Sequence, residues 1–73
     1  MTNFIKLTEL YLTMDGEVLE REMFINPHHI KHFADIYPPN FHTYVTAIHW
    51  ALGGFNPTFV KETPEQIIEL LAK

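Results

Sequence analysis

The sequence predicts an α+β fold: a small antiparallel sheet of four to five strands, strongly curved or barrel-like, with one C-terminal helix. Short apolar and β-branched runs are separated by the turn-forming pairs Asp15-Gly16 and Asn26-Pro27, as is typical of strands joined by turns. The clearest helical spacing of apolar residues comes after those runs, at the C-terminal end. A chain of 73 residues has room for one domain, so 1–73 is predicted to fold as a single unit.

The first two strands are predicted to form a hairpin. Residues 4–13 are rich in β-branched, aromatic and leucine side chains, which favour a strand. The Asp15-Gly16 pair follows, and it predicts a primed turn in which the glycine adopts a positive φ. Residues 17–25 alternate between apolar and charged positions and are predicted to be an amphipathic second strand. Pro27 lies beyond its end, because proline cannot donate to a strand ladder.

The segment 28–37 has two interpretations. Ile30 and Phe33 could belong to a helical stripe, or a short turn could lead into a strand. We predict the turn followed by the third strand, which the Pro38-Pro39 pair ends.

Residues 42–52 are predicted to form the fourth strand, with both faces largely covered. Gly53-Gly54 reverses the chain, and residues 58–61 suffice for a short antiparallel return strand. One face of the fourth strand would present Tyr44, Thr46, Ile48, Trp50 and Leu52.

The C-terminal segment carries the clearest local signal. Thr63 is a good N-cap, Pro64 suits the first helical position, and Gln66 stands where a capping box requires it. A helix is therefore predicted over 64–72. Because so short a helix does not persist alone in water, we expect it to dock on the sheet.

Taken in order, these pieces resemble the small flagellar FlbD-like (swarming motility) proteins. The resemblance rests on Ile5-Lys6-Leu7-Thr8, on Phe24-Ile25-Asn26-Pro27 followed by Ile30, and on the ending 59–71, Phe-Val-Lys-Glu-Thr-Pro-Glu-Gln-Ile-Ile-Glu-Leu-Leu. The chain departs from the pattern by a longer first hairpin and a longer loop at 37–42. The resemblance implies a non-enzymatic protein linked with flagellar function and swarming, with no catalytic residues. A bacterial or phage protein with another role stays open as an alternative.

Charge and composition exclude several function classes. Nine acidic against five basic side chains give a formal charge of −4, which disfavours general attraction to nucleic acid or anionic lipid. The absence of cysteine excludes disulfides, thiol nucleophiles and cysteine metal sites. No apolar run is long enough to cross a bilayer and no signal peptide is visible, so we expect a cytoplasmic protein with no membrane insertion.

Small size predicts a homo-oligomer. Domains of this length seldom obtain enough stability from one core and add disulfides, metal or self-association. The chain has ten aromatic residues, more than so small a core hides. The residues predicted for the interface are Tyr44, Ile48, Trp50, Phe55 and Phe59.

The histidines suggest a metal site as an alternative. His28, His29 and His32 form the one cluster with ligand spacing, and on a helix the first and last would share a face and bind Zn²⁺ or Ni²⁺. Structural zinc needs four ligands, so His42, His49 or Asp35 would have to converge with them. The plainer interpretation is that these are polar turn and surface residues, and no cofactor is predicted.

The sequence thus predicts a non-enzymatic protein–protein interaction module that acts as a homo-oligomer. No serine or cysteine nucleophile is present, and Glu20 and Glu22 fall on the solvent face of an alternating strand. Besides metal binding, the alternative is a small regulator that binds RNA or DNA through a local patch of aromatic and basic residues, although the charge makes nucleic acid an unlikely partner.

Overall fold

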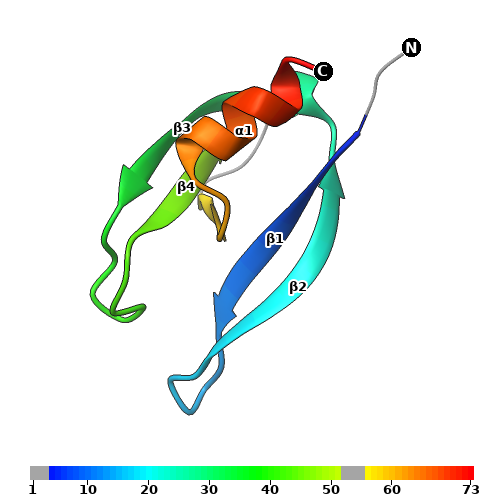
Figure 1. Cartoon of the computed structure of the whole chain (residues 1–73). Coiled ribbons are helices and arrows are strands. Elements are labelled where there is room, and N and C mark those ends of the chain that lie inside the picture. The colour runs from blue at the N-terminus through cyan, green and yellow to red at the C-terminus, as the bar shows by residue number, and fades with distance from the viewer. Residues whose placement is uncertain (1–3, 52–55) are drawn as a thin grey trace.

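Residues 4–51 and 56–73 are described by the computed structural model, and they confirm the predicted α+β fold (Figure 1). Within them, a five-stranded antiparallel sheet is followed by one C-terminal helix. The elements are β1 (Ile5–Leu12), β2 (Val18–Ile25), a 3₁₀ turn (Pro27–His29), β3 (Ile30–Ile36), β4 (Val45–Trp50), β5 (Thr58–Val60) and α1 (Pro64–Leu71).

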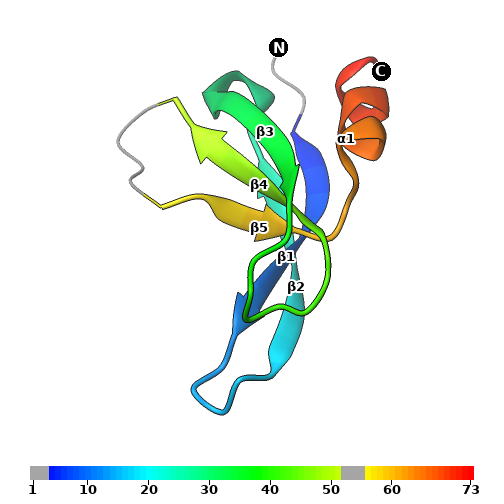
Figure 2. The same ribbon diagram turned by 90° about the vertical axis from the view of Figure 1, so that its left-hand side faces the viewer.

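The sheet is open and curved. Its strands lie in the order β2-β1-β5-β4-β3, so β2 and β3 form its outer edges (Figures 1 and 2). The barrel-like alternative is wrong, because no pairing joins β2 to β3 in the described part of the chain. The physical reason lies in β5, which has three residues and pairs with β1 only at Glu9 and Leu10. With so short a strand between them, the β1–β2 and β3–β4 hairpins diverge.

The first hairpin forms where predicted, but its turn is not the predicted primed turn. Gly16 has a φ of 83° and donates its backbone N–H to the Thr13 carbonyl at 3.0 Å. A type I′ turn needs positive φ at both central positions. Asp15 does not have it, since His42 is the only non-glycine residue with positive φ in the described ranges. The loop therefore places Gly16 at its last position, as in hairpins that carry a glycine bulge.

The turn-then-strand interpretation of 28–37 is confirmed. The Asn26 side chain starts the 3₁₀ turn, because its Oδ1 accepts the His28 backbone N–H at 3.0 Å. β3 follows at once and pairs with β4 in antiparallel register, with a bulge between Ile30 and His32.

β4 is shorter than the predicted strand 42–52, because a loop precedes it. Phe41 closes a turn in this loop through a backbone hydrogen bond, and His42 has a left-handed φ of 57°. Tyr44 belongs to the loop rather than to the strand. Leu52, at the other end of the predicted strand, lies outside the described residues.

The face of the sheet that α1 covers, which we call the helix side, holds the main core. Ile67 of α1 is completely buried there among side chains from four strands. Burial of one such side chain stabilises the fold by roughly 1.5–3 kcal/mol, which explains why a short helix persists once it is docked. The buried members of this cluster are Ile5, Leu7, Ile25, Ile48, Val60 and Ile67.

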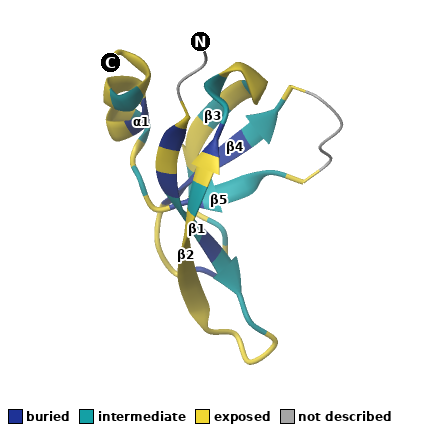
Figure 3. Cartoon of the chain, turned by 90° about the vertical axis from the view of Figure 1, so that its right-hand side faces the viewer, coloured by how far each residue is buried: buried dark blue, intermediate teal, exposed yellow. Residues whose placement is uncertain are grey.

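The opposite face, which we call the open side, carries a second and smaller cluster of Leu10, Phe41 and Val45. Phe41 comes from the loop between β3 and β4, so a loop rather than a helix covers this cluster. β2 is exposed along nearly all of its length (Figure 3). Among the described residues, the outer strands and the part of the open side beyond this cluster are thus the least covered parts of the sheet.

The helix begins with the predicted capping box. The Thr63 hydroxyl accepts the Gln66 backbone N–H at 3.2 Å, and the Gln66 side chain accepts the Thr63 backbone N–H at 2.9 Å. Pro64 occupies the first turn, where no backbone N–H is needed.

Candidate functional site

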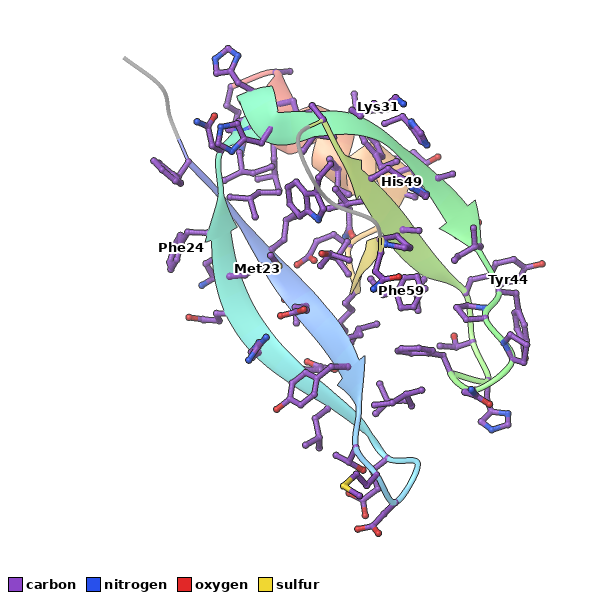
Figure 4. All side chains as sticks on the ribbon, turned by 180° about the vertical axis from the view of Figure 1, so that it is seen from behind. Met23, Phe24, Lys31, Tyr44, His49 and Phe59 are labelled. Atoms are coloured by element: carbon purple, nitrogen blue, oxygen red, sulfur yellow. The ribbon has the colours of Figure 1, made fainter. Side chains whose placement is uncertain are left out.

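Three pairs of rings in contact lie in the loop and on the strands β3, β4 and β5 within the described residues (Figure 4). The His32 and His49 rings stack with centroids 4.4 Å apart and planes 25° apart. The other two pairs meet edge to face: Tyr37 with Tyr44 at 5.0 Å, and Phe41 with Phe59 at 5.1 Å.

The register of β3 and β4 explains the histidine pair. His32 and His49 stand opposite each other in the ladder, so both side chains rise from the same face. Ala34 and Ala47 form a further opposed pair on that face and add little bulk beside the imidazoles. His32 is therefore exposed and His49 half-buried.

Accessible aromatic surface lies in two places: at Phe4 and Phe24 of the first hairpin, and at the loop end of β3 and β4. Tyr37 and Tyr44 are 54% and 66% exposed, whereas Phe41 is 7% exposed in the cluster below them. Edge-to-face ring pairs contribute about 0.5–1.5 kcal/mol beyond the burial of their area.

The residues predicted for an interface do not share one surface. Ile48 is completely buried in the helix-side core, so its assignment to an interface is wrong: its side chain cannot reach a partner in the folded chain. Trp50 follows two positions later on the same side, where it is half-buried. Its indole Nε1–H donates to the Thr58 hydroxyl at 2.9 Å. Both side chains lie on the face of β4 that α1 covers, and the sequence alone does not show which face that is.

The remaining interface residues lie elsewhere. Phe59 is half-buried and packs with the open-side cluster, and Tyr44 is exposed in the neighbouring loop. Figure 4 looks onto this side of the molecule, with Phe59 and His49 near the centre and Tyr44 at the loop end. Phe55 lies outside the described residues.

The predicted metal ligands are not brought together. His28 and His29 are exposed in the 3₁₀ turn, whereas His32 lies on β3 against His49. Over residues 4–51 and 56–73, no group of three or more histidine, cysteine, aspartate or glutamate side chains is arranged to hold a metal ion.

Ion pairs engage three of the basic side chains with glutamates of the first hairpin. The pairs are Lys6 with Glu22 at 3.0 Å, Arg21 with Glu9 at 2.7 Å and Lys61 with Glu20 at 3.4 Å. The hydrogen bond to Glu9 and the charge of its carboxylate raise the pKa of Arg21 above its ordinary value. Since carboxylates already neutralise these cations, they do not form a patch available to phosphates.

The outer strand β3 is a surface that the sequence analysis missed. Lys31, Ala34 and Asp35 are exposed on it. Neither charged residue forms an ion pair within the described part of the chain. Their spacing on either side of Phe33 is visible in the sequence, but the position of β3 at an edge depends on β1 pairing with β5, which no local pattern indicates.

No helix in the described ranges is long and apolar enough to span a bilayer. Comparison with known proteins found no family model, no curated protein and no solved structure that matches the chain.

Proposed function

We propose that this chain is a non-enzymatic protein–protein interaction module that works as a homo-oligomer. The observation that carries the proposal is the open sheet, in which the described residues leave the outer edge of β3 unpaired beside exposed Tyr37, Tyr44 and His32. A free strand edge presents N–H and C=O groups that pair readily with another strand. Edge and rings together supply hydrogen bonding and apolar contact along the β3 side of the sheet.

The surface of the domain supports self-association. Large apolar side chains are exposed on several elements: Phe4, Met14, Val18, Leu19, Phe24, Tyr37, Tyr44, Ile68 and Leu71. A domain of this size buries a smaller share of its surface than a large one, so contact with a second copy adds burial that its own core lacks.

The interior supports a role other than catalysis. Every buried side-chain nitrogen and oxygen in the described residues has a hydrogen-bond partner. The buried Thr46 is an example, since its hydroxyl donates to the Glu62 carbonyl. The polar groups inside the fold therefore serve the fold and are not left free for a ligand.

The resemblance to FlbD-like proteins supplies the setting proposed for this module, namely flagellar function and swarming. Deletion of the gene in its source, followed by a swarming assay, tests the setting separately. We expect reduced swarming. Unchanged swarming would contradict the flagellar role, whereas the proposed protein–protein interaction would still stand.

Native mass spectrometry of tag-free protein over a concentration series tests the module itself. We expect a metal-free oligomer whose fraction rises with concentration. A monomer at every concentration would contradict the proposal, and a monomer carrying one zinc ion would support the metal-binding alternative instead. A mobility shift with RNA or DNA at low salt, without self-association, would favour the regulator.

A further inference from the structure

β3 carries its two charged residues symmetrically about its centre. Lys31 and Asp35 lie two positions before and two positions after Phe33. Both are exposed on an outer strand, and both lack an ion pair inside the described chain. Exposed charges of opposite sign, equally far from a central residue, are complementary to a second copy of the same strand run in the opposite direction.

The geometry of a two-fold axis limits the registers available. When the axis is normal to the sheet, opposed residues must lie on the same face, so the register must be centred on a residue rather than between two. Centred on Phe33, it places Lys31 opposite Asp35 of the second copy, twice. Centred on His32 or on Ala34, it places one of the two charges opposite Phe33 and leaves both charges without a partner.

The neighbouring positions suit the same register. His32 then faces Ala34 of the second copy, a large side chain against a small one. The bulge at Lys31 interrupts regular strand geometry there, so the ladder is short and ends at the ion pairs.

The other outer strand, β2, does not offer a comparable register at its charged centre. A register of β2 centred on Arg21 places Glu20 opposite Glu22 of the second copy, twice. Registers centred on Glu20 or on Glu22 oppose that carboxylate to itself. Like charges directly opposite each other are destabilising, so registers centred on this charged middle of β2 are disfavoured, whereas the β3 register centred on Phe33 opposes unlike charges.

We infer that two copies of the chain join edge to edge through β3, in antiparallel register centred on Phe33, to form a closed dimer with one continuous sheet. The inference rests on the proposed self-association and names its surface. Both helices then lie on the same face of the joined sheet. α1 packs against β3 and exposes Ile68 and Leu71, so each helix lies beside the joined strands and carries exposed apolar side chains.

Charge exchange at the two positions tests the register by native mass spectrometry and sedimentation. Lys31→Glu and Asp35→Lys each oppose like charges twice, and we expect each to raise the dimer dissociation constant about tenfold or more. The double variant restores both ion pairs at the original net charge of −4, and we expect it to dimerise like the wild type.

A mixture of the two single variants gives a sharper result. In the mixed dimer, position 31 of each copy faces an opposite charge at position 35, so we expect the mixed dimer to exceed both homodimers. Lys73→Glu is the matched control, because it makes the same charge change at an exposed lysine without an ion pair in the described residues. Mixed with Asp35→Lys, it should give no such preference. Circular dichroism checks that every variant is folded.

The outcomes separate the two proposals. A wild-type chain that stays monomeric overturns both. A wild-type oligomer that ignores the single charge exchanges, or that the double variant fails to restore, overturns the β3 register and leaves self-association standing. Oligomers that grow without limit as concentration rises also overturn the closed dimer, since a two-fold interface uses up the β3 edge.

Discussion

Glu62 completes the pairing of β1 at Thr8, where β5 has already ended. Its Oε1 accepts the Thr8 backbone N–H at 2.8 Å, and its Oε2 accepts the Thr8 hydroxyl at 3.0 Å. The preceding residue, Lys61, donates its own N–H to the Thr8 carbonyl at 2.9 Å. A side-chain carboxylate thus takes the place that a backbone carbonyl would hold in a longer strand, and it fixes the start of the helix segment to the middle of the sheet.

Glu62→Ala should lower the free energy of unfolding by about 1.5–3 kcal/mol, because it removes charged acceptors from a backbone N–H and a hydroxyl that are partly buried. Urea unfolding followed by the fluorescence of Trp50, the sole tryptophan, measures the change. Glu69→Ala removes the same charge from an exposed helix position and should change stability by less than about 0.5 kcal/mol. Equal losses in the two variants would show that charge, not the contact with Thr8, is responsible.

Thr63→Ala should cost about 1 kcal/mol, because the Gln66 N–H loses its capping hydroxyl at the helix start. For a domain of this size, that corresponds to a fall in Tm of about 4–8 °C, which a circular dichroism melt resolves. Thr63→Ser keeps the hydroxyl and serves as the control. If the serine variant melts as low as the alanine variant, the cap is not what stabilises α1.

Thr58→Val should destabilise by about 1–2 kcal/mol with little change in shape, because the half-buried Trp50 indole N–H then lacks its acceptor. Thermal unfolding measures the cost, and the emission maximum of Trp50 reports the altered surroundings of the indole. Thr58→Ser retains the acceptor and should stay near the wild type in both readings. Identical emission and stability in all three proteins would contradict a role for this hydrogen bond.

Local signals account for the parts of the fold that the sequence analysis predicted well. The cap at Thr63, the turn at Gly16 and the break at Pro27 each depend on a few adjacent residues, whose backbone preferences act whatever surrounds them. The turn type at Gly16 was wrong because an Asp-Gly pair fits two loop lengths, and the choice depends on the register of the flanking strands.

Non-local pairings account for what was missed. The bond between Thr8 and Glu62 joins residues 54 positions apart, and the order of the strands depends on β1 meeting the short β5. Without that order, nothing shows that β3 is an edge or that Lys31 and Asp35 are exposed on it. The interface prediction failed at Ile48 for a related reason: aromatic and aliphatic content indicates apolar surface, but not which face the helix will cover.

Ile48 and Ile68 offer a direct test of that correction, because the same truncation should cost much stability at Ile48 and little at Ile68. Ile48 is completely buried, so Ile48→Ala leaves a cavity and should cost about 2–5 kcal/mol. A single core of this size seldom contributes more than about 3–5 kcal/mol, so much of the variant should be unfolded by circular dichroism. Ile68 is 57% exposed, and Ile68→Ala should stay folded within about 0.5 kcal/mol of the wild type when monomeric. An Ile48→Ala protein with wild-type stability and lost self-association would return Ile48 to the interface, because only a contact outside the monomer core would then explain its effect.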